Sequence, residues 1–506
     1  MAEKEKPINK TTWVPDTYII IFFVILFAAL LTWTVPVGQF QTRDIKYMMG
    51  STEKTKTVLI PETFKYKLDA AGAPEKIGIV PFKPYGDVGI LNYVFEGFCA
   101  GDKWGSAVGI MAFILIVGGA FGIIMRTGAI ENGIKKMIAK TKGMDYIIIP
   151  VLFILFSLGG AVFGMGEEAI PFVFIVVPVV IAMGYDSIVA VMITYCATQI
   201  GFATSWMNPF SVCIAQGIAQ IPVLSGSGFR MVMWAFFTLL GIAYTLYHAN
   251  KVRKHPELSP VRASDEYFRT ELANQADNKD ARFETGHALV LLTVLVGMIW
   301  IIWGVVEKGY YIPEIATQFF IMGLVSGLIG LVFKLNGMKL DDLAVSFRHG
   351  AADLLGAAMV VGMAKGIILV LGGDSPTNPT VLNTILHNAG AMISGFAPVF
   401  SAWIMYLFQA IFNFFVVSGS GQAALTMPLM SPLADIAGLT RQVAVLAFQL
   451  GDGFTNLIVP TSACLMACIG AAKIDWATWA KWQIKFQAVL FFFGSLFVIG
   501  AVLTGF

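Results

Sequence analysis

Long apolar runs separated by short polar segments recur from one end of the chain to the other. Runs of about 20 apolar residues have the length that an α-helix needs to cross the hydrocarbon core of a membrane. The first run covers about 18–37 and the second about 106–126, and the polar segment between them is rich in Gly and Pro. This pattern predicts an all-α polytopic membrane protein.

Two later apolar blocks are too long for one simple span, and each contains an internal break. The block 145–184 is interrupted by GMGEE, and the block 187–220 is interrupted by QIGFATSWMNP. Backbone that leaves the helix at membrane depth is tolerated only where protein buries it or water reaches it. We therefore expect a re-entrant helical hairpin over 145–184 and a broken transmembrane helix over 187–220.

The second half of the chain shows the same order of breaks. A hairpin pattern over 397–437 is interrupted at SGSGQ, and a broken-helix pattern over 442–470 is interrupted at QLGDGFTNLIVPT. Between the two broken helices, Gly201 aligns with Gly451 and Pro209 with Pro460. Because glycine is frequent in membrane helices, a single match carries little weight. Two interrupted segments in the same order predict an internal repeat.

The positions of basic residues set the expected topology, because short cytoplasmic loops carry an excess of Lys and Arg. Three lysines precede the first span, and four more lie between residues 135 and 142, after the second span. On this basis the N-terminus is cytoplasmic, and the two hairpins open to opposite sides, so the repeats are inverted. The expected segments are the N-terminus with the first span (1–37), an extracytoplasmic cap (38–105), the first repeat (106–248), a cytoplasmic linker (249–286) and the second repeat (287–506).

Inverted repeats with paired broken helices are typical of secondary transporters, and the breaks indicate the binding site. The composition, 57% hydrophobic and 13% charged, agrees with a membrane protein, and the net charge of +2 gives no basic face for a nucleic acid. The sequence has no GxxxxGK[ST] and no HExxH, and its five cysteines form no CxxC. These absences argue against an ATP-driven pump, an enzyme and a resident cofactor.

The first hairpin places Glu167 and Glu168 in an apolar run, directly after Gly164 and Gly166. A charged side chain at the centre of a lipid-facing helix costs roughly 3 kcal/mol, so both carboxylates are expected to face protein, a cavity or water. One interpretation is that they cap a returning half-helix, where the helix dipole favours negative charge. The other is that they line a substrate site, with one of the two facing the substrate.

The tip of the second hairpin is polar and rich in glycine. Hydroxyl, amide and backbone N–H groups at the start of a helix form a cradle for a carboxylate. The alternative is a turn selected only for tight packing. The residues expected to bind substrate here are Ser418, Gly419, Ser420, Gly421 and Gln422.

The two broken helices supply further oxygen atoms. Side-chain oxygens beside unwound backbone carbonyls suit a sodium ion, and a buried acid suits proton coupling, so Na⁺ and H⁺ both remain candidates. A structural cap is the alternative for Asp452. The substrate candidates are Ser205, Asn208, Asp452 and Asn456, and the ion-coupling candidates are Thr204, Asp452, Thr455 and Thr461.

A single lysine, Lys365, lies within the apolar segment VVGMAKGIILV. It either pairs with one of the buried carboxylates, as their charge partner, or extends its ammonium group to the membrane surface. Three acidic side chains against one lysine leave a surplus of negative charge for a cation.

Several long strings resemble the YfcC-type membrane proteins of the C4-dicarboxylate anaerobic carrier and basic amino acid antiporter group. The similar strings are GGAVFGMGEEA, ATQIGFATSWMNPF, VLSGSG, NFFVVSGSGQAALTMPL and FQLGDGFTN. The resemblance covers essentially the whole chain. It implies the fold of the ion transporter superfamily, with a scaffold domain, a mobile transport domain, a homodimer and elevator-type movement.

The sequence as a whole predicts a secondary transporter in a bacterial cytoplasmic membrane, surrounded by lipid. Helix N-termini favour a substrate carboxylate and the surplus acids favour a cation, and an amino acid carries both groups. A basic amino acid would use the surplus acid, in agreement with the exchange of arginine, ornithine or lysine that the resemblance implies. The alternative is a sodium-coupled or antiporting C4-dicarboxylate carrier, with one acid binding sodium and another paired to Lys365.

Overall fold

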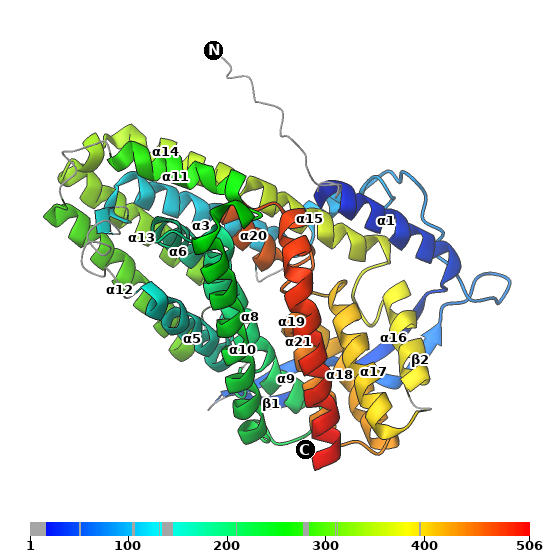
Figure 1. Cartoon of the computed structure of the whole chain (residues 1–506). Helices are drawn as coiled ribbons and strands as arrows, with labels where there is room; N and C mark the ends of the chain where they lie inside the picture. Colours follow the sequence, from blue (N-terminus) through cyan, green and yellow to red (C-terminus); the bar gives the residue numbers. More distant parts are fainter. Residues whose placement is uncertain are drawn as a thin grey trace.

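The computed structural model of the chain is mostly helical (Figure 1). It describes residues 17–49, 52–103, 107–130, 132–133, 145–208, 210–276, 283–308, 310, 312–393 and 396–506. The lysines expected in cytoplasmic positions, before residue 17 and between 135 and 142, lie outside the described residues.

The helices follow the apolar blocks of the sequence. In the first half they are α1 (Thr17–Thr34), α2 (Tyr93–Cys99), α3 (Ala107–Arg126), α5 (Asp145–Phe163), α6 (Ala169–Ala182), α7 (Ser187–Val191), α8 (Ala197–Ala203), α9 (Val212–Ile218), α10 (Ser227–Lys254) and α11 (Arg262–Ala276). In the second half they are α12 (Thr285–Lys308), α13 (Ile312–Val332), α14 (Leu340–Asp353), α15 (Leu355–Val370), α16 (Val381–Ile393), α17 (Pro398–Asn413), α18 (Gly419–Ile436), α19 (Arg441–Thr455), α20 (Ala463–Ala471) and α21 (Trp476–Thr504).

Long and short apolar helices occur together. Among the described residues, four helices are long and apolar enough to cross a membrane, namely α3, α10, α13 and α21. The pair α14 and α15, bent by 43°, would make a fifth span. Apolar helices of 10–17 residues, such as α6 and α17, accompany them. The long apolar helices fit a polytopic membrane protein.

Each of the four interrupted segments contains a break between two helices, but only GMGEE lies wholly within its break, and most of SGSGQ belongs to α18. Residues 164–168 separate α5 from α6, 204–211 separate α8 from α9, 414–418 separate α17 from α18, and 456–462 separate α19 from α20. Gly164 has φ of 73°, in the left-handed region that a residue with a Cβ rarely adopts. Its position explains why the chain can turn sharply at the end of α5.

One helix pair in each half of the chain packs closely. Helix α5 lies along α8, as α17 lies along α19, and both pairs come close at a glycine. A Cβ on Gly201 of α8 would collide with the Ser157 carbonyl of α5, and one on Gly451 of α19 would lie 2.6 Å from the Gln409 Cβ of α17. The glycines that align in the sequence therefore have the same packing role.

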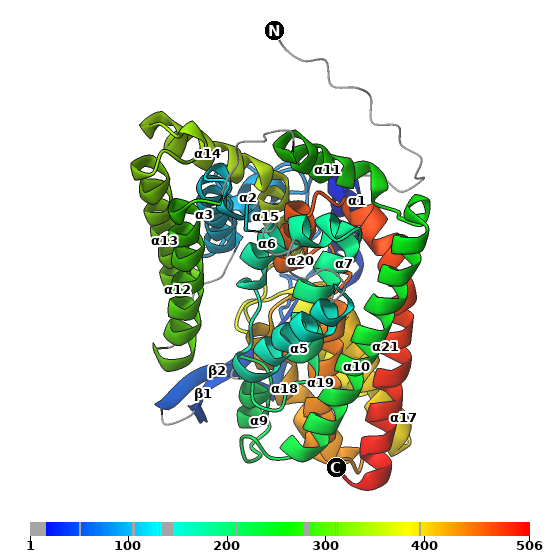
Figure 2. The same cartoon turned by 60° about the vertical axis from the view of Figure 1, so that its left-hand side comes forward.

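Helices α10 and α21 stand side by side along the molecule (Figure 2). Aromatic rings join them, with the Phe236 and Phe497 centroids 5.3 Å apart and those of Phe229 and Phe506 4.3 Å apart. The C-terminus lies at the end of the molecule where α10 begins, and α11 follows α10 at the opposite end.

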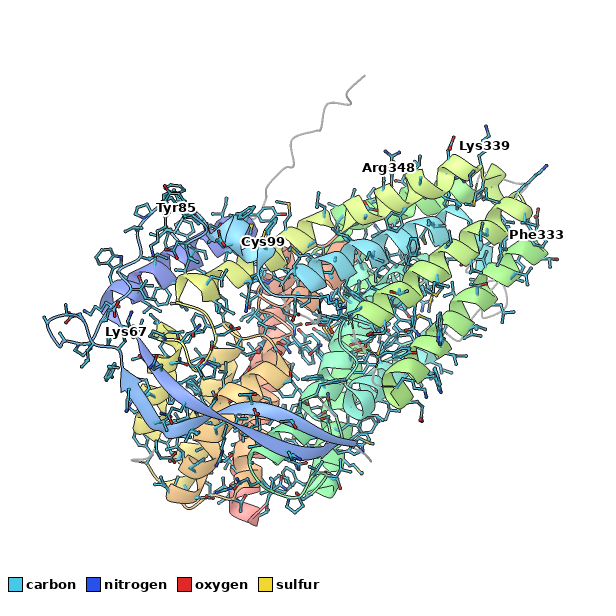
Figure 3. The ribbon with its side chains drawn as sticks, turned by 180° about the vertical axis from the view of Figure 1, so that it is seen from behind. Lys67, Tyr85, Cys99, Phe333, Lys339 and Arg348 are labelled. Atoms are coloured by element: carbon cyan, nitrogen blue, oxygen red, sulfur yellow. The ribbon has the colours of Figure 1, made fainter. Side chains whose placement is uncertain are left out.

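The prediction of an all-α fold is wrong for part of the segment between α1 and α2. Strands β1 (Gly38–Met49) and β2 (Thr52–Tyr66) form a long antiparallel ribbon that packs against α9, α16 and α18 (Figure 3). Apolar and polar residues alternate in TKTVLIPETFKYKL, which is the period of a strand. Phe64 of the ribbon stacks on His387 of α16 at 3.9 Å between centroids.

A buried polar cluster attaches the segment after α10 to the helices. Asp186 accepts hydrogen bonds from Ser259 Oγ (2.7 Å) and Val189 N (3.1 Å), and its Oδ2 lies 3.0 Å from His248 Nε2. Because the Trp482 indole N–H donates to His248 Nδ1, that nitrogen carries no proton and Nε2–H is the donor to Asp186. Asp265 of α11 accepts from Ser187 N at 3.2 Å, which fixes α11 to the start of α7.

The attachment of α11 is expected to weaken as pH rises. Burial raises the pKa of Asp265 from 3.8 to about 6, so between these values the attached state binds more protons than a detached state. Stability therefore falls as pH increases through that window.

Asp265→Asn, which stays neutral, should remove this pH dependence and protect the Ser187 amide from hydrogen exchange more at pH 7 than the unmodified protein does. Hydrogen exchange at pH 5, 6 and 7, corrected for the intrinsic rate, measures it. Asp341→Asn, at an exposed position, is the control, and an unchanged pH dependence in Asp265→Asn would contradict the explanation.

Candidate functional site

The turn between α5 and α6 opens onto a cavity of about 140 Å³, which we call the acidic cavity. Gly164, Gly166, Glu167 and Glu168 all line it. The carboxylate of Glu168 turns back and accepts the Gly166 N–H at 2.9 Å. Glu168 therefore accepts a backbone hydrogen bond within the turn before α6. Glu167 is the better candidate for the expected contact with substrate.

The start of α18 forms another wall of the acidic cavity, through Ser418, Gly419 and Ser420. The Ser418 hydroxyl accepts the Gly421 N–H at 3.3 Å and caps the helix. Gln422 does not line this cavity, because its side-chain amide donates to the backbone carbonyl (3.0 Å) and to Oε1 (2.7 Å) of Gln409 on α17. Gln422 thus connects α18 to α17.

A third helix, α20, also begins at the acidic cavity, with Ser462, Ala463 and Cys464 in its lining. The Cys464 thiol donates to the Gly166 carbonyl at 3.1 Å, so the second broken helix contacts the first hairpin turn directly. The N-termini of α6, α18 and α20 therefore converge on one cavity. Unpaired N–H groups and aligned dipoles at such ends favour an anion.

A network of amides forms a polar wall beside these helix ends. Asn456 lines the cavity and donates to Gln199 Oε1 at 3.3 Å, while its Oδ1 accepts from Asn413 at 2.7 Å. Tyr195 donates to the Asn456 carbonyl at 2.8 Å. Gln199, Asn413 and Tyr195 were not among the site residues expected from the sequence. Their one sequence signal is a polar group within an otherwise apolar helix.

Aromatic side chains complete the lining of the acidic cavity. They are Phe202, Phe210 and Tyr310. No sequence signal marks them, because aromatic residues are common throughout the chain and only the fold brings these three together.

Asp452 lies beneath the start of α18 and is fully buried. Within the described residues neither carboxylate oxygen has a hydrogen-bond partner. It lies close to the cavity wall at Gly419, where an added Cβ would lie 3.1 Å from Oδ2. A buried carboxylate without partners is costly, which is unusual for a residue with only a capping role.

Other candidates from the broken helices do not line the acidic cavity. The Thr204 hydroxyl donates to the Ile200 carbonyl at 2.7 Å, and the Asn208 amide donates to the Gly160 carbonyl at 3.2 Å. Thr455 is the last residue of α19. The buried hydroxyls of Ser205 and Thr461 have no hydrogen-bond partner among the described residues. Of this group, Thr461 lines a second cavity, beside α15.

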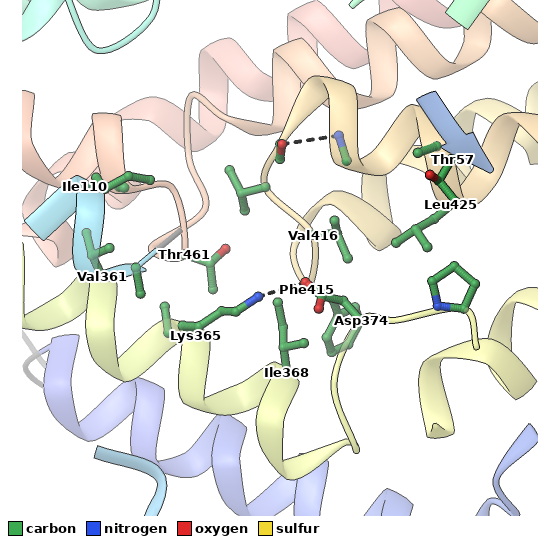
Figure 4. A pocket seen from close by; sticks show the side chains of 18 residues that line it. Thr57, Ile110, Val361, Lys365, Ile368, Asp374, Phe415, Val416, Leu425 and Thr461 are labelled. Carbon is green, nitrogen blue, oxygen red and sulfur yellow. Dashed lines mark hydrogen bonds and ion pairs between the residues drawn. The ribbon is translucent and has the colours of Figure 1, made fainter. Parts of the chain in front are cut away.

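Lys365 does not pair with Glu167, Glu168 or Asp452, and this part of the predicted arrangement needs correction. Its Nζ lies 2.7 Å from Oδ2 of Asp374, in the loop after α15 (Figure 4). Nine residues separate the two, so the end of α15 brings them together locally. The pair lines a second cavity of about 370 Å³, to which Gly421 also contributes, and which we call the vestibule.

Comparison with known proteins gives matches over nearly the whole chain. The sequence profile of the family DcuC, described as "C4-dicarboxylate anaerobic carrier", matches residues 14–503. A protein of Escherichia coli K12 named "Putative basic amino acid antiporter YfcC" is 51% identical over 494 residues, covering 97% of each chain. An "Uncharacterized protein" of Haemophilus influenzae is 29% identical over 520 residues, covering 98% of each.

Among solved structures, the Alcanivorax borkumensis YdaH transporter aligns with 97% of this chain and 99% of its own. Its TM-score is 0.39, at 13% sequence identity.

Proposed function

The chain belongs to the C4-dicarboxylate anaerobic carrier family, and from that premise we propose that it exchanges amino acids across the membrane, with a preference for arginine, ornithine and lysine. The family assignment makes it a membrane transporter with a small-molecule substrate. The observation that carries the choice of substrate is the acidic cavity, where three helix N-termini and Glu167 and Glu168 meet. The helix ends suit a carboxylate and the glutamates suit a cation.

A basic amino acid fits this pairing better than a simple acid would. Its carboxylate would be held by backbone N–H groups at the starts of α6, α18 and α20, and its cationic groups would face Glu167 and the polar wall. The name of the similar Escherichia coli protein agrees with this substrate class. The convergent helix ends also favour a second candidate, a C4-dicarboxylate carrier, in agreement with the description of the family.

Exchange in liposomes separates the two candidates. Purified protein is reconstituted into vesicles loaded with unlabelled ornithine, and the entry of labelled arginine and of labelled succinate is followed with and without a sodium gradient. We expect arginine entry that requires internal ornithine, and little succinate entry. Succinate entry with no arginine entry would overturn the proposal in favour of the dicarboxylate carrier.

We further propose that the two halves are inverted repeats, each with a re-entrant hairpin and a broken helix, and that transport is of the elevator type. The equivalent packing of α5 on α8 and α17 on α19 supports the repeat, as do the matched close approaches at Gly201 and Gly451. In this proposal α5–α10 and α17–α21 form the transport domain. The remaining spans form a scaffold that dimerises, with the N-terminus in the cytoplasm.

A further inference from the structure

The vestibule adjoins the acidic cavity on the side of the β-ribbon. It lies between α15, the start of α18 and Thr57 of β2 (Figure 4). Ile110, Val417, Ser418 and Ala463 line both cavities, so a molecule in the vestibule would be in contact with the wall of the acidic cavity. The two cavities form consecutive compartments.

The sizes of the compartments differ in a way that bears on substrate entry. Cavities that hold small ligands usually have volumes of about 300–1,000 Å³. The vestibule, at about 370 Å³, falls in that range, whereas the acidic cavity, at about 140 Å³, is well below it. In this conformation the vestibule has room for an amino acid with a long side chain, and the acidic cavity must widen before it can hold one.

The charge of the vestibule is concentrated in one ion pair. Among the described residues that line it, Lys365 and Asp374 are the only charged ones, and the others are apolar or carry a single hydroxyl, as Thr57, Ser418 and Thr461 do. Both charged side chains remain partly accessible, at 22% and 43%. Ion pairs that water reaches contribute little to stability, so a ligand with complementary charges can separate this one at small cost.

Asp374 is held in position by its loop. Gly372 and Gly373 both have φ of 95°, which turns the chain sharply after α15. The Asn383 amide then donates to the carbonyls of Ser375, Pro376 and Asn378 at 2.9–3.1 Å. The Phe40 N–H of β1 donates to the Pro376 carbonyl at 2.8 Å. The loop therefore presents a fixed carboxylate, which the flexible Lys365 side chain can leave.

We propose that the vestibule is a second binding site, which receives an α-amino acid by its head group before the acidic cavity opens. Lys365 binds the substrate carboxylate, Asp374 binds its α-ammonium group, and the side chain extends along the apolar wall towards Ser418. This inference rests on the proposed amino acid substrate. It adds a recognition step that requires both charged groups of the head, and so gives the vestibule a part in specificity.

Three ligands test the site in the full-length protein in liposomes. L-Arginine carries both head-group charges, agmatine lacks the carboxylate, and N-acetyl-L-arginine lacks the ammonium charge. Each is measured as an inhibitor of labelled ornithine exchange. Lys365→Met removes the partner of the substrate carboxylate. It should raise the inhibition constants of arginine and N-acetyl-arginine about tenfold and leave that of agmatine unchanged. Asp374→Asn should raise the inhibition constants of arginine and agmatine by a similar factor and leave that of N-acetyl-arginine unchanged.

The ion pair Lys83–Asp87, at 3.0 Å, provides matched controls, because neither residue lines a cavity described above. Lys83→Met and Asp87→Asn should leave all three inhibition constants unchanged. Lys365→Arg should retain the ligand pattern of the unmodified protein. An equal effect of Lys365→Met or Asp374→Asn on all three ligands, or no effect on any, would overturn the proposal and assign the ion pair a structural role. Absence of arginine and ornithine exchange in the unmodified protein would instead refute the proposed function.

Discussion

Glutamine in place of Glu167 is expected to lower the kcat/KM for arginine exchange about 100-fold. The carboxylate lines the acidic cavity, and hydrogen bonds to charged groups contribute about 1.5–3 kcal/mol, equivalent to roughly 10- to 150-fold in binding. Glu168→Gln should have a smaller effect, because that carboxylate already accepts the Gly166 N–H and glutamine can still accept it. The double variant should be inactive towards arginine. Initial rates of labelled arginine entry into ornithine-loaded vesicles give these values.

A matched control is Glu96→Gln. Glu167 lies two residues before α6 and Glu96 lies in the first turn of α2, so both are near a helix start, but Glu96 does not line the acidic cavity. The exchange rate of Glu96→Gln should equal that of the unmodified protein. This comparison separates the loss of a substrate contact from a general effect of removing a glutamate near a helix start. Normal arginine exchange in Glu167→Gln would refute the contact. Undiminished succinate entry in the double variant, together with absent arginine entry in every variant, would favour the dicarboxylate carrier.

The sequence alone predicted the helices and their breaks, because the signals are local. Apolar length, Gly and Pro at membrane depth and the GMGEE and SGSGQ strings each act within about one turn of their own position. It also identified hairpin-tip residues that line the acidic cavity, namely Gly164, Gly166, Glu167, Glu168, Ser418, Gly419 and Ser420. A charged or hydroxyl-bearing residue at the start of a buried helix is costly unless it has a function or a partner, and this cost made the residues recognisable.

Three features depend on contacts between segments that the pattern of apolar and polar residues does not predict. The β-ribbon was missed because strand alternation was outweighed by the helical character of the rest of the chain. The partner of Lys365 was misassigned because Asp374 lies in a loop outside the apolar run, and only the turn at Gly372 and Gly373 brings it back. Gln199 and Asn456 meet from different halves of the chain, and nothing in either segment specifies the other.

Asn in place of Asp452 is expected to raise stability while it abolishes exchange. Asp452 is fully buried and its carboxylate has no hydrogen-bond partner within the described part of the chain, so the ionised side chain costs free energy in the absence of a bound cation. Removal of the charge at constant volume relieves that cost. We expect the midpoint of thermal unfolding in detergent to rise by several degrees and arginine exchange to fall more than 100-fold.

Asp186→Asn is the natural comparison, since Asp186 is equally buried but accepts hydrogen bonds from Ser259, Val189 and His248. That substitution should lower the midpoint, because an amide cannot replace a carboxylate as acceptor for all three donors. If the unfolding midpoint rises in Asp452→Asn and falls in Asp186→Asn, the first aspartate is retained for transport and the second for structure. Loss of stability with normal exchange in Asp452→Asn would make Asp452 a structural cap.

Comparison of the unmodified protein with Asp452→Asn also identifies the coupling ion. A cation that binds the folded state at Asp452 raises the unfolding midpoint with increasing concentration, and the effect requires the carboxylate. If the ion is Na⁺, sodium should stabilise the unmodified protein relative to an equal concentration of choline, and Asp452→Asn should not respond. If the ion is H⁺, sodium should have no effect, and lowering the pH should stabilise the unmodified protein more than the variant. Equal responses of the two proteins to both ions would exclude Asp452 as the coupling site.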